Sequence, residues 1–185
     1  MVATVDVLVN GYADDRVAST VVLIREGDVI IVVDPGMTVS RDALLDPLHQ
    51  LGVHEDDVTD VIFSHHHPDH TLNAALFCSA RFHDVWAVYK NDVWSDRMDA
   101  FEGAPSVSLL DTPGHTPEDI STLVETEDGL VVCTHLWWSS DGPEIDPLAK
   151  DQAQLEESRR VVLSLCPSLI IPGHGRAFTP SEILK

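Results

Sequence analysis

The order of expected elements predicts a layered α/β sandwich, formed as one domain over residues 1–185. Short runs rich in β-branched residues dominate the chain, and two segments with helical spacing of apolar residues are interleaved among them. No repeat, low-complexity tract or linker divides the sequence. With 44% apolar residues, a chain of this length can bury a core without disulfides.

The first half of the chain alternates strand-like runs with one helix. Strands are expected over 4–10, over two runs within 19–36 that turn at 26–28, and over 57–64, with a turn-rich loop at 10–15. A helix is expected over 40–53, because Ser40 is of a type that caps helix N-termini and Gly52 of the type that ends helices.

The second half is mostly strand. Strands are expected over 84–89, over 105–112, over two runs within 120–135 that turn at 127–129, and over 167–175. The clearest helix covers 150–165, where helical spacing predicts that Leu155, Val162 and Leu165 face the core.

The charge balance is strongly acidic, since 31 Asp and Glu residues against 11 Lys and Arg residues give a net charge of −20. The acids are spread along the whole chain, so they describe the surface and not an acidic tail. Such a field repels nucleic acid at low salt. It is also typical of a halophilic protein in a very salty cytoplasm, where molar salt screens charges over about 3 Å. We favour this interpretation, which weakens the charge argument against a nucleic-acid substrate.

Cysteine content and hydropathy exclude several classes of protein. Cys78, Cys133 and Cys166 form no CxxC pair, so they indicate neither a disulfide framework nor a cysteine zinc site, and we expect buried thiols. No window approaches about 18 uninterrupted apolar residues, so no membrane span is expected. The first residues lack the basic and apolar regions of a signal peptide, which favours a cytoplasmic protein.

The stretch SHHHPDH (64–70) is the most informative part of the sequence. In extended backbone after a strand, His65 and His67 are two residues apart and point the same way. A proline then suits the start of a helix that continues through TLNAALF (71–77), which places Asp69 and His70 in its first turn. Imidazoles and a hard anionic ligand at a strand-to-helix junction predict a metal site more strongly than a cluster of solvated histidines.

Three further histidines follow apolar strands. His115 lies in DTPGHTPED, His135 in VVCTHLWW and His174 in IIPGHG. Each would more often be structural if it stood alone. Together with SHHHPDH they give four strand ends that we expect to converge on one edge of the sandwich.

These motifs resemble those of the metallo-β-lactamase superfamily. HHHPDH matches its H-x-H-x-D-H signature, PGHT its third motif, PGHG its last, and VVDPG (32–36) its early strand ending in an aspartate and a glycine. The matches run from residue 32 to residue 175 in the family's order, and the chain is especially similar to small stand-alone members with GYA near the start. The resemblance implies a four-layer αβ/βα sandwich of two mixed sheets flanked by helices, with a metal site along one edge.

The resemblance also implies a dinuclear site. The first metal would be held by His65, His67 and His115, and the second by Asp69, His70 and His174. Zinc, with two ions per chain, is the expected metal, although iron and manganese accept the same ligand types. Asp69 is also the expected catalytic residue, because it can orient the attacking water while binding metal.

Two residues near the ligands have competing interpretations. Asp34 supports the site by hydrogen bonds to a ligand or loop, or it belongs to a plain D-P-G turn. His66 alternates away from the ligands, so we expect it beside the site or in a purely structural place.

His135 marks a departure from the family. Most two-metal hydrolases of the superfamily have at this place an aspartate that bridges both metals, and a neutral imidazole offers one lone pair to one metal. His135 therefore binds the second metal as a terminal ligand, leaves that metal weakly held, or points elsewhere. We favour the first, under which the site is more positive and suits an anionic substrate.

The substrate cleft can be outlined from the flanking loops. Tyr12 lies in the loop 10–18, and Trp137 and Trp138 lie in the segment 136–148, next to strand ends that carry histidines. These side chains line the cleft, or both tryptophans pack beneath the long loop.

The expected function is metal-dependent hydrolysis of a small ester, thioester or lactone by metal-activated water, because the chain is little more than the core fold. A phosphodiesterase or ribonuclease similar to the tRNase Z branch is the alternative. The positive site favours it, and the lack of a basic RNA-binding patch opposes it. Loss of the second metal would indicate a mononuclear iron enzyme similar to persulfide dioxygenases, or an inactive binding module. The expected partner is a small-molecule substrate, with an anionic one as an option, in preference to nucleic acid or a membrane, and the oligomeric state stays open.

Overall fold

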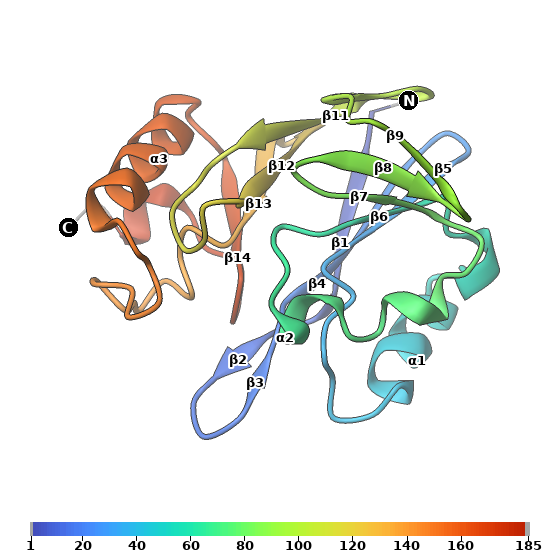
Figure 1. The fold of residues 1–185 in the computed structure, drawn as a ribbon, viewed down its shortest axis with the longest axis horizontal. Helices are drawn as coiled ribbons and strands as arrows, with labels where there is room; N and C mark the ends of the chain where they lie inside the picture. The colour runs from blue at the N-terminus through green and yellow to red at the C-terminus, as the bar shows by residue number, and fades with distance from the viewer. Residues whose placement is uncertain (1, 184–185) are drawn as a thin grey trace.

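The structure, a computed structural model, describes residues 2–183 and has four layers. Figure 1 shows helix α3 outside a five-stranded sheet, a seven-stranded sheet facing that one, and helix α1 on the far side. The predicted fold class, two mixed sheets flanked by helices, is confirmed.

The larger sheet has the strand order β1-β4-β5-β6-β7-β8-β9. Its strands are β1 (Thr4–Val9), β4 (Val21–Glu26), β5 (Val29–Val33), β6 (Asp60–Ile62), β7 (Arg81–His83), β8 (Ala87–Lys90) and β9 (Val93–Asp96). β5, β6 and β7 run parallel, and the other neighbours run antiparallel. The parallel centre brings the carboxyl ends of β5 and β6 to one edge, just before Asp34 and SHHHPDH.

The smaller sheet has the order β10-β11-β12-β13-β14. Its strands are β10 (Ala100–Phe101), β11 (Ala104–Asp111), β12 (Ile120–Thr126), β13 (Gly129–Thr134) and β14 (Leu169–Pro172), and only β13 and β14 are parallel. A short hairpin of β2 (Tyr12–Ala13) and β3 (Val17–Ala18) projects from the fold (Figure 1).

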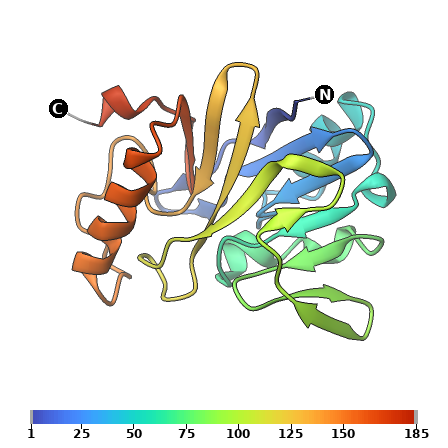
Figure 2. The ribbon, with the colours of Figure 1, turned by 90° about the horizontal axis from the view of Figure 1, so that it is seen from above.

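Two longer helices cover the sheets. They are α1 (Asp42–Gln50) and α3 (Gln152–Ser164), and the short elements are α2 (Pro68–Thr71) and the 3-10 turns η1 (Glu55–Asp57), η2 (Ala74–Leu76) and η3 (Pro180–Glu182). Seen from above in Figure 2, α3 lies at one side of the molecule and the β8–β9 hairpin at the opposite side. Within residues 2–183, no helix is long and apolar enough to cross a membrane.

Three apolar clusters hold the layers together. The central cluster lies between the sheets and includes Ile31, Ile62, Val107 and Ile171. Leu44 and Leu48, one helical turn apart, bury α1 against the outer face of the larger sheet. Leu155 and Val162 do the same for α3 on the smaller sheet.

The helix after SHHHPDH is shorter than the sequence predicts. A longer α2 would pair Asn73 N–H with the carbonyl of Asp69, but Asn73 N–H donates to the carbonyl of Gly36 at 2.9 Å. The Asp69 carbonyl accepts from Met37 N–H instead, also at 2.9 Å. Contacts with the loop after β5 therefore end the helix at Thr71, and TLNAALF forms only the turn η2.

Other local predictions are wrong at particular residues. Leu165 follows the end of α3 and is 40% exposed, because the helix presents only Leu155 and Val162 from that set to the sheet. Cys133 is buried in β13, whereas Cys78 and Cys166 are exposed. The loop 10–15 contains β2, and the short strands β7, β9 and β10 were not predicted, because they carry too few apolar residues for a clear pattern.

Asp60, at the start of β6, joins the central strands of the larger sheet. Its buried carboxylate accepts two hydrogen bonds from Arg81, at 2.8 and 3.1 Å, and lies 2.6 Å from His83 Nε2. Burial would raise the pKa of the Asp60 carboxyl, but the bonds from His83, Arg81 and Thr59 outweigh burial and hold this pKa below its usual value.

We predict that Asp60→Asn lowers the free energy of unfolding by about 3 kcal/mol, because it leaves the buried His83 ring and the half-buried guanidinium of Arg81 without a charged acceptor. Since the Asp60 pKa is lower in the folded chain, its contribution is complete above the unfolded pKa of about 3.9 and is lost as the pH falls through the folded pKa. Denaturant unfolding of both proteins between about pH 7 and pH 3 measures this. A stability difference that stays constant over that range would contradict the prediction.

Candidate metal centre

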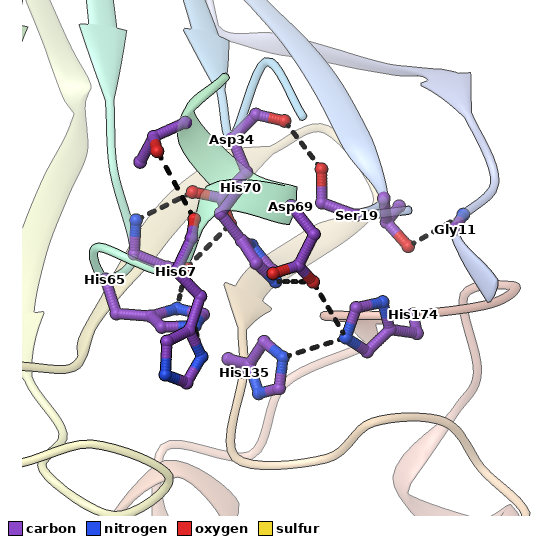
Figure 3. A network of polar contacts seen from close by, with 12 residues as sticks. Gly11, Ser19, Asp34, His65, His67, Asp69, His70, His135 and His174 are labelled. Atoms are coloured by element: carbon purple, nitrogen blue, oxygen red, sulfur yellow. Dashed lines mark hydrogen bonds and ion pairs between the residues drawn. The ribbon is translucent and has the colours of Figure 1, made fainter. Parts of the chain in front are cut away.

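The histidines at four strand ends meet at one edge of the two sheets. His65 and His67 follow β6, His115 follows β11, His135 follows β13 and His174 follows β14. Figure 3 shows His65, His67, His135 and His174 gathered beside α2, which carries Asp69 and His70. The predicted convergence is therefore present in the structure.

The first group consists of three histidines. His67 Nδ1 lies 2.9 Å from His65 Nε2 and 3.0 Å from His115 Nε2. His65 and His115 are buried, and His67 is half-buried. Three imidazole nitrogens this close together, with one ring reaching solvent, match the donor set of a site that a metal can enter from outside.

The second group consists of Asp69, His70 and His174. Asp69 Oδ2 lies 3.5 Å from His70 Nε2 and 3.7 Å from His174 Nε2. Among the residues described, His70 Nε2 is buried without a hydrogen-bond partner. A buried nitrogen that faces a carboxylate and a second imidazole fits a metal ligand, since leaving it unpaired is otherwise costly.

His135 lies between the two groups. Its Nε2 is 3.1 Å from His174 Nε2, and its ring stacks on His115 with centroids 4.0 Å apart. His135 also forms a possible ligand group with His65 and His70. The interpretation that His135 points elsewhere is therefore wrong, and those of a terminal or a weak ligand of the second metal remain.

The space for His135 depends on Gly173. A Cβ at position 173 would lie 2.3 Å from His135 Cδ2 and 2.7 Å from its Nε2, closer than atoms pack. The PGHG motif thus serves packing as well as turning. Gly173 has no side chain, so the His135 ring can lie against the backbone directly before His174.

Asp34 fixes two of the rings. Its Oδ2 lies 2.9 Å from His70 Nδ1, and its two oxygens accept bonds from Ser64 N–H at 2.8 Å and Ser64 Oγ at 2.7 Å. Ser64 Oγ in turn lies 3.0 Å from His65 Nδ1. Asp34 has φ of 49°, a conformation that aspartate tolerates better than most residues. Of its two interpretations, the structure favours support of the site.

Asp146 is a residue that the sequence did not indicate. Its buried Oδ2 lies 2.7 Å from His115 Nδ1 and accepts from Trp138 Nε1 at 2.9 Å. Burial raises the pKa of this carboxyl, but bonds from His115 and Leu148 N–H outweigh it and lower the pKa to about 2. A lone aspartate in a polar loop, 31 positions after His115, gives no sequence signal.

Burial keeps several of the clustered imidazoles neutral. It lowers the pKa of His65 and His135 well below the usual value, and neighbouring imidazoles lower both further. Burial also lowers the pKa of His67 and His174. A neutral imidazole has a free lone pair, so these rings are in the form that binds metal.

The remaining predicted site residues separate into two kinds. Trp138 lies against the site, with its ring 5.9 Å from His115 and 5.7 Å from His174. Trp137 instead packs in the third apolar cluster against Phe178 and beneath Arg159, so the packing alternative applies to it alone.

His66 and Tyr12 point to neighbours outside the two groups. His66 Nε2 lies 3.1 Å from Asp84, and its ring stacks on Trp86 with the centroids 5.3 Å apart. Of the two positions expected for His66, beside the ligands or purely structural, these contacts fit the structural one. Tyr12 lies in the β2–β3 hairpin beneath the guanidinium of Arg16, 5.0 Å from the ring centroid. Its place in a cleft stays a prediction.

A hollow of about 190 Å³ opens beside the first group. It is lined by His67, His115, Thr116, Pro117, Glu118, Leu148 and Lys150. Cavities that enclose drug-sized ligands are usually about 300 Å³ or more, so this one suits a small polar group next to the histidines.

Comparison with known proteins places these features in a family. The sequence profile of the Metallo-beta-lactamase superfamily matches residues 14–97. The chain is 35% identical to Metallo-beta-lactamase domain-containing protein 1 of Xenopus laevis, over 95% of this chain and 81% of that one. It spans 62% and 59% of the length of the rat and human proteins of the same name.

Two further similarities concern a bacterial enzyme and a solved structure. The chain is 31% identical to an N-acyl homoserine lactonase of a Bacillus species, over 55% of this chain and 45% of that one. The crystal structure of a metallo-β-lactamase-like protein from Thermotoga maritima superposes with a TM-score of 0.75 at 24% identity, covering 97% of this chain and 100% of the other. The latter similarity concerns the fold.

We predict that Asp146→Asn weakens metal binding at the first group by about tenfold, because His115 loses its charged partner while the residue keeps its size. Zinc titration with a competing chelator measures the affinity. Asp141→Asn, an exposed acid in the same loop segment, is the matched control and should leave the affinity unchanged. Equal affinity in all three proteins would refute the role of Asp146.

We predict that Gly173→Ala displaces His135 and lowers the metal content by about one ion per chain, together with a loss of about 2 kcal/mol from overpacking. Elemental analysis and thermal unfolding measure the two effects. The double variant Gly173→Ala/His135→Ala has room for the new methyl group, so it should regain stability but not metal. Unchanged metal content in Gly173→Ala would mean that His135 is not a ligand.

Proposed function

The chain belongs to the metallo-β-lactamase superfamily of metal-dependent hydrolases, and we propose that it uses two zinc ions to hydrolyse a small anionic ester, thioester or lactone. The observation that carries the proposal is the pair of adjoining donor groups, His65/His67/His115 and Asp69/His70/His174, of which the first borders a hollow open to solvent. Cytoplasmic location, expected from the first residues, and salt adaptation, expected from the charge balance, remain predictions.

The donor atoms follow from the contacts that the rings make on their other sides. His65, His70, His115 and His174 have their Nδ1 atoms occupied by Ser64, Asp34, Asp146 and the Ala18 carbonyl, so each presents Nε2. His67 presents Nδ1. The second ion would then contact His70, His174 and Asp69, with His135 Nε2 as a fourth donor.

When bound, the ions supply an acidic water as nucleophile and positive charge for the oxygen that becomes negative. The protein's own side chains hold the ligand rings in the orientation that binding requires. Asp34 and Asp146 accept from ring nitrogens and so fix the tautomers of His70 and His115. Asp69, half-buried in the second group, offers a second carboxylate oxygen that can accept a proton from the attacking water.

Lys150 supports an anionic substrate. It is one of only three lysines in a chain of net charge −20, yet it lines the hollow beside His67 and His115. A carboxylate or phosphate on the substrate could pair with the ammonium group while the scissile bond lies over the histidines. Glu118, on the same hollow, disfavours a second negative group and would accept from an N–H of the substrate.

Among ester, thioester and lactone substrates, a lactone is supported by the similarity of the chain to known lactonases. The Bacillus relative is named as an N-acyl homoserine lactonase, and a solved lactone hydrolase with product bound at its catalytic metal centre shares the fold at a TM-score of 0.65 and 18% identity. The hollow of about 190 Å³ would accept the ring and leave an acyl chain in solvent.

A phosphodiesterase is the second candidate, and His135 is the observation that favours it. With a neutral imidazole in place of a bridging carboxylate, the centre carries one more positive charge, which stabilises a phosphorane-like transition state better than an acyl one. The acidic surface opposes a nucleic-acid substrate at low salt, so a small phosphodiester fits this candidate better.

The proposal predicts hydrolysis of carboxylate-bearing lactones or thioesters by the zinc-loaded chain and none by the metal-free chain. Assays in molar and in low salt should use matched anionic and neutral substrates, with small phosphodiesters in parallel. Two zinc ions with acyl hydrolysis support the proposal. Turnover of phosphodiesters alone would replace it by the second candidate, and one iron ion without hydrolysis would overturn both.

Lys150→Gln gives the sharper part of this test. It should raise KM for anionic substrates by about tenfold, leave kcat unchanged, and leave neutral substrates unaffected. Lys90→Gln removes the same charge from β8, away from the hollow, and is the matched control. An equal effect of both variants would mean that only the overall charge matters.

A further inference from the structure

We propose a third metal site, formed by His49, His54 and Glu55 at the end of α1 and separate from the candidate centre. His49 is in the last turn of α1, His54 is the N-cap residue of η1, and Glu55 is its first residue. None of the three belongs to the groups at the sheet edge. The expected ligand is a divalent transition-metal ion such as zinc.

The geometry of the donors carries this proposal. His49 Nε2 lies 2.9 Å from Glu55 Oε2, and the rings of His49 and His54 have centroids 4.9 Å apart. One donor atom from each residue lies within 4.8 Å of the other two. Ligands bound at about 2.1 Å around one zinc ion lie roughly 3.4 Å apart, so side-chain rotations alone would complete the site.

The path of the backbone brings His49, His54 and Glu55 together, and none of the three has a positive φ. After His49 the chain reverses at Gly52, which has φ of 75° and whose N–H donates to the His49 carbonyl at 2.9 Å. His54 N–H then donates to Asp57 Oδ2 at 2.9 Å, which fixes the start of η1. The reversal therefore returns His54 and Glu55 to the helical turn that carries His49.

The local charge favours a cation here. The carbonyl groups at the end of α1 give that helix end a partial negative charge, and His49 lies in this last turn. Asp56 and Asp57 follow Glu55, and the whole chain carries a net charge of −20. This field raises the local concentration of cations around the two imidazoles.

The donor set selects the class of ion. Two imidazoles and one carboxylate suit zinc, nickel or copper, whereas magnesium and calcium prefer oxygen donors alone. The side chains of His49 and Glu55 are 38% and 36% exposed, so water can fill the remaining positions. A bound ion would join the end of α1 to η1, directly before β6 and the strand end that carries His65.

The test is a zinc titration of the full chain after its catalytic centre has been loaded with zinc and excess metal removed. Calorimetry and elemental analysis should find about one additional ion per chain, and this ion should raise the thermal unfolding temperature. His49→Gln and His54→Gln should each lose the additional ion and the temperature rise. Both variants should keep the zinc of the centre and the hydrolytic activity.

Two matched charge changes separate a coordinated ion from general attraction. Glu55→Gln removes a donor, and Asp56→Asn removes the same charge from the neighbouring exposed residue. Loss of the additional ion in Glu55→Gln but not in Asp56→Asn is expected. Equal loss in both, or retention of the ion in both histidine variants, would overturn the proposal and leave His49 and Glu55 as an ion pair only.

Discussion

The candidate centre depends on one constraint, which is that buried imidazoles must stay neutral and aim their lone pairs inward. Buried polar groups are costly unless each finds a partner, and a ring with two free nitrogens could turn either way. The carboxylate of Asp34 meets this constraint for two rings. It contacts His70 Nδ1 directly, and it contacts His65 Nδ1 through the hydroxyl group of Ser64. The αL backbone of Asp34, directly after β5, aims the carboxylate at α2 and the β6 end.

The position of the centre follows from the junction of the two sheets. The larger sheet and α2 contribute His65, His67, Asp69 and His70, and the smaller sheet contributes the three later histidines. Backbone bonds join the layers at this edge, from Thr20 N–H to the Gly173 carbonyl at 2.8 Å and from Ile120 N–H to the Ser64 carbonyl at 2.9 Å. The donors are thus held by rigid strand ends, and the apolar cluster between the sheets supports them.

His135 changes the chemistry of this centre without changing its construction. The ring is held by stacking on His115 and by the space above Gly173, and its Nδ1 is buried without a hydrogen-bond partner among the described residues. The other buried rings of the two groups have a polar partner on the side away from the centre. His135 is therefore positioned by packing more than by hydrogen bonds, which makes it the donor most sensitive to its neighbours.

The sequence by itself determined a layered α/β fold and the strand ends that carry the histidines, because strand periodicity and the spacing within SHHHPDH are local properties of the chain. The division of these residues into two donor groups came from the resemblance to the family. The sequence also located the departure at His135. Tertiary structure decided that α2 ends at Thr71, that Trp138 and not Trp137 reaches the centre, and that Asp146 supports His115. The same holds for His49, His54 and Glu55, which only a chain reversal brings together. These outcomes depend on contacts between residues distant in the chain or on the path of a loop, for which composition and periodicity carry no signal.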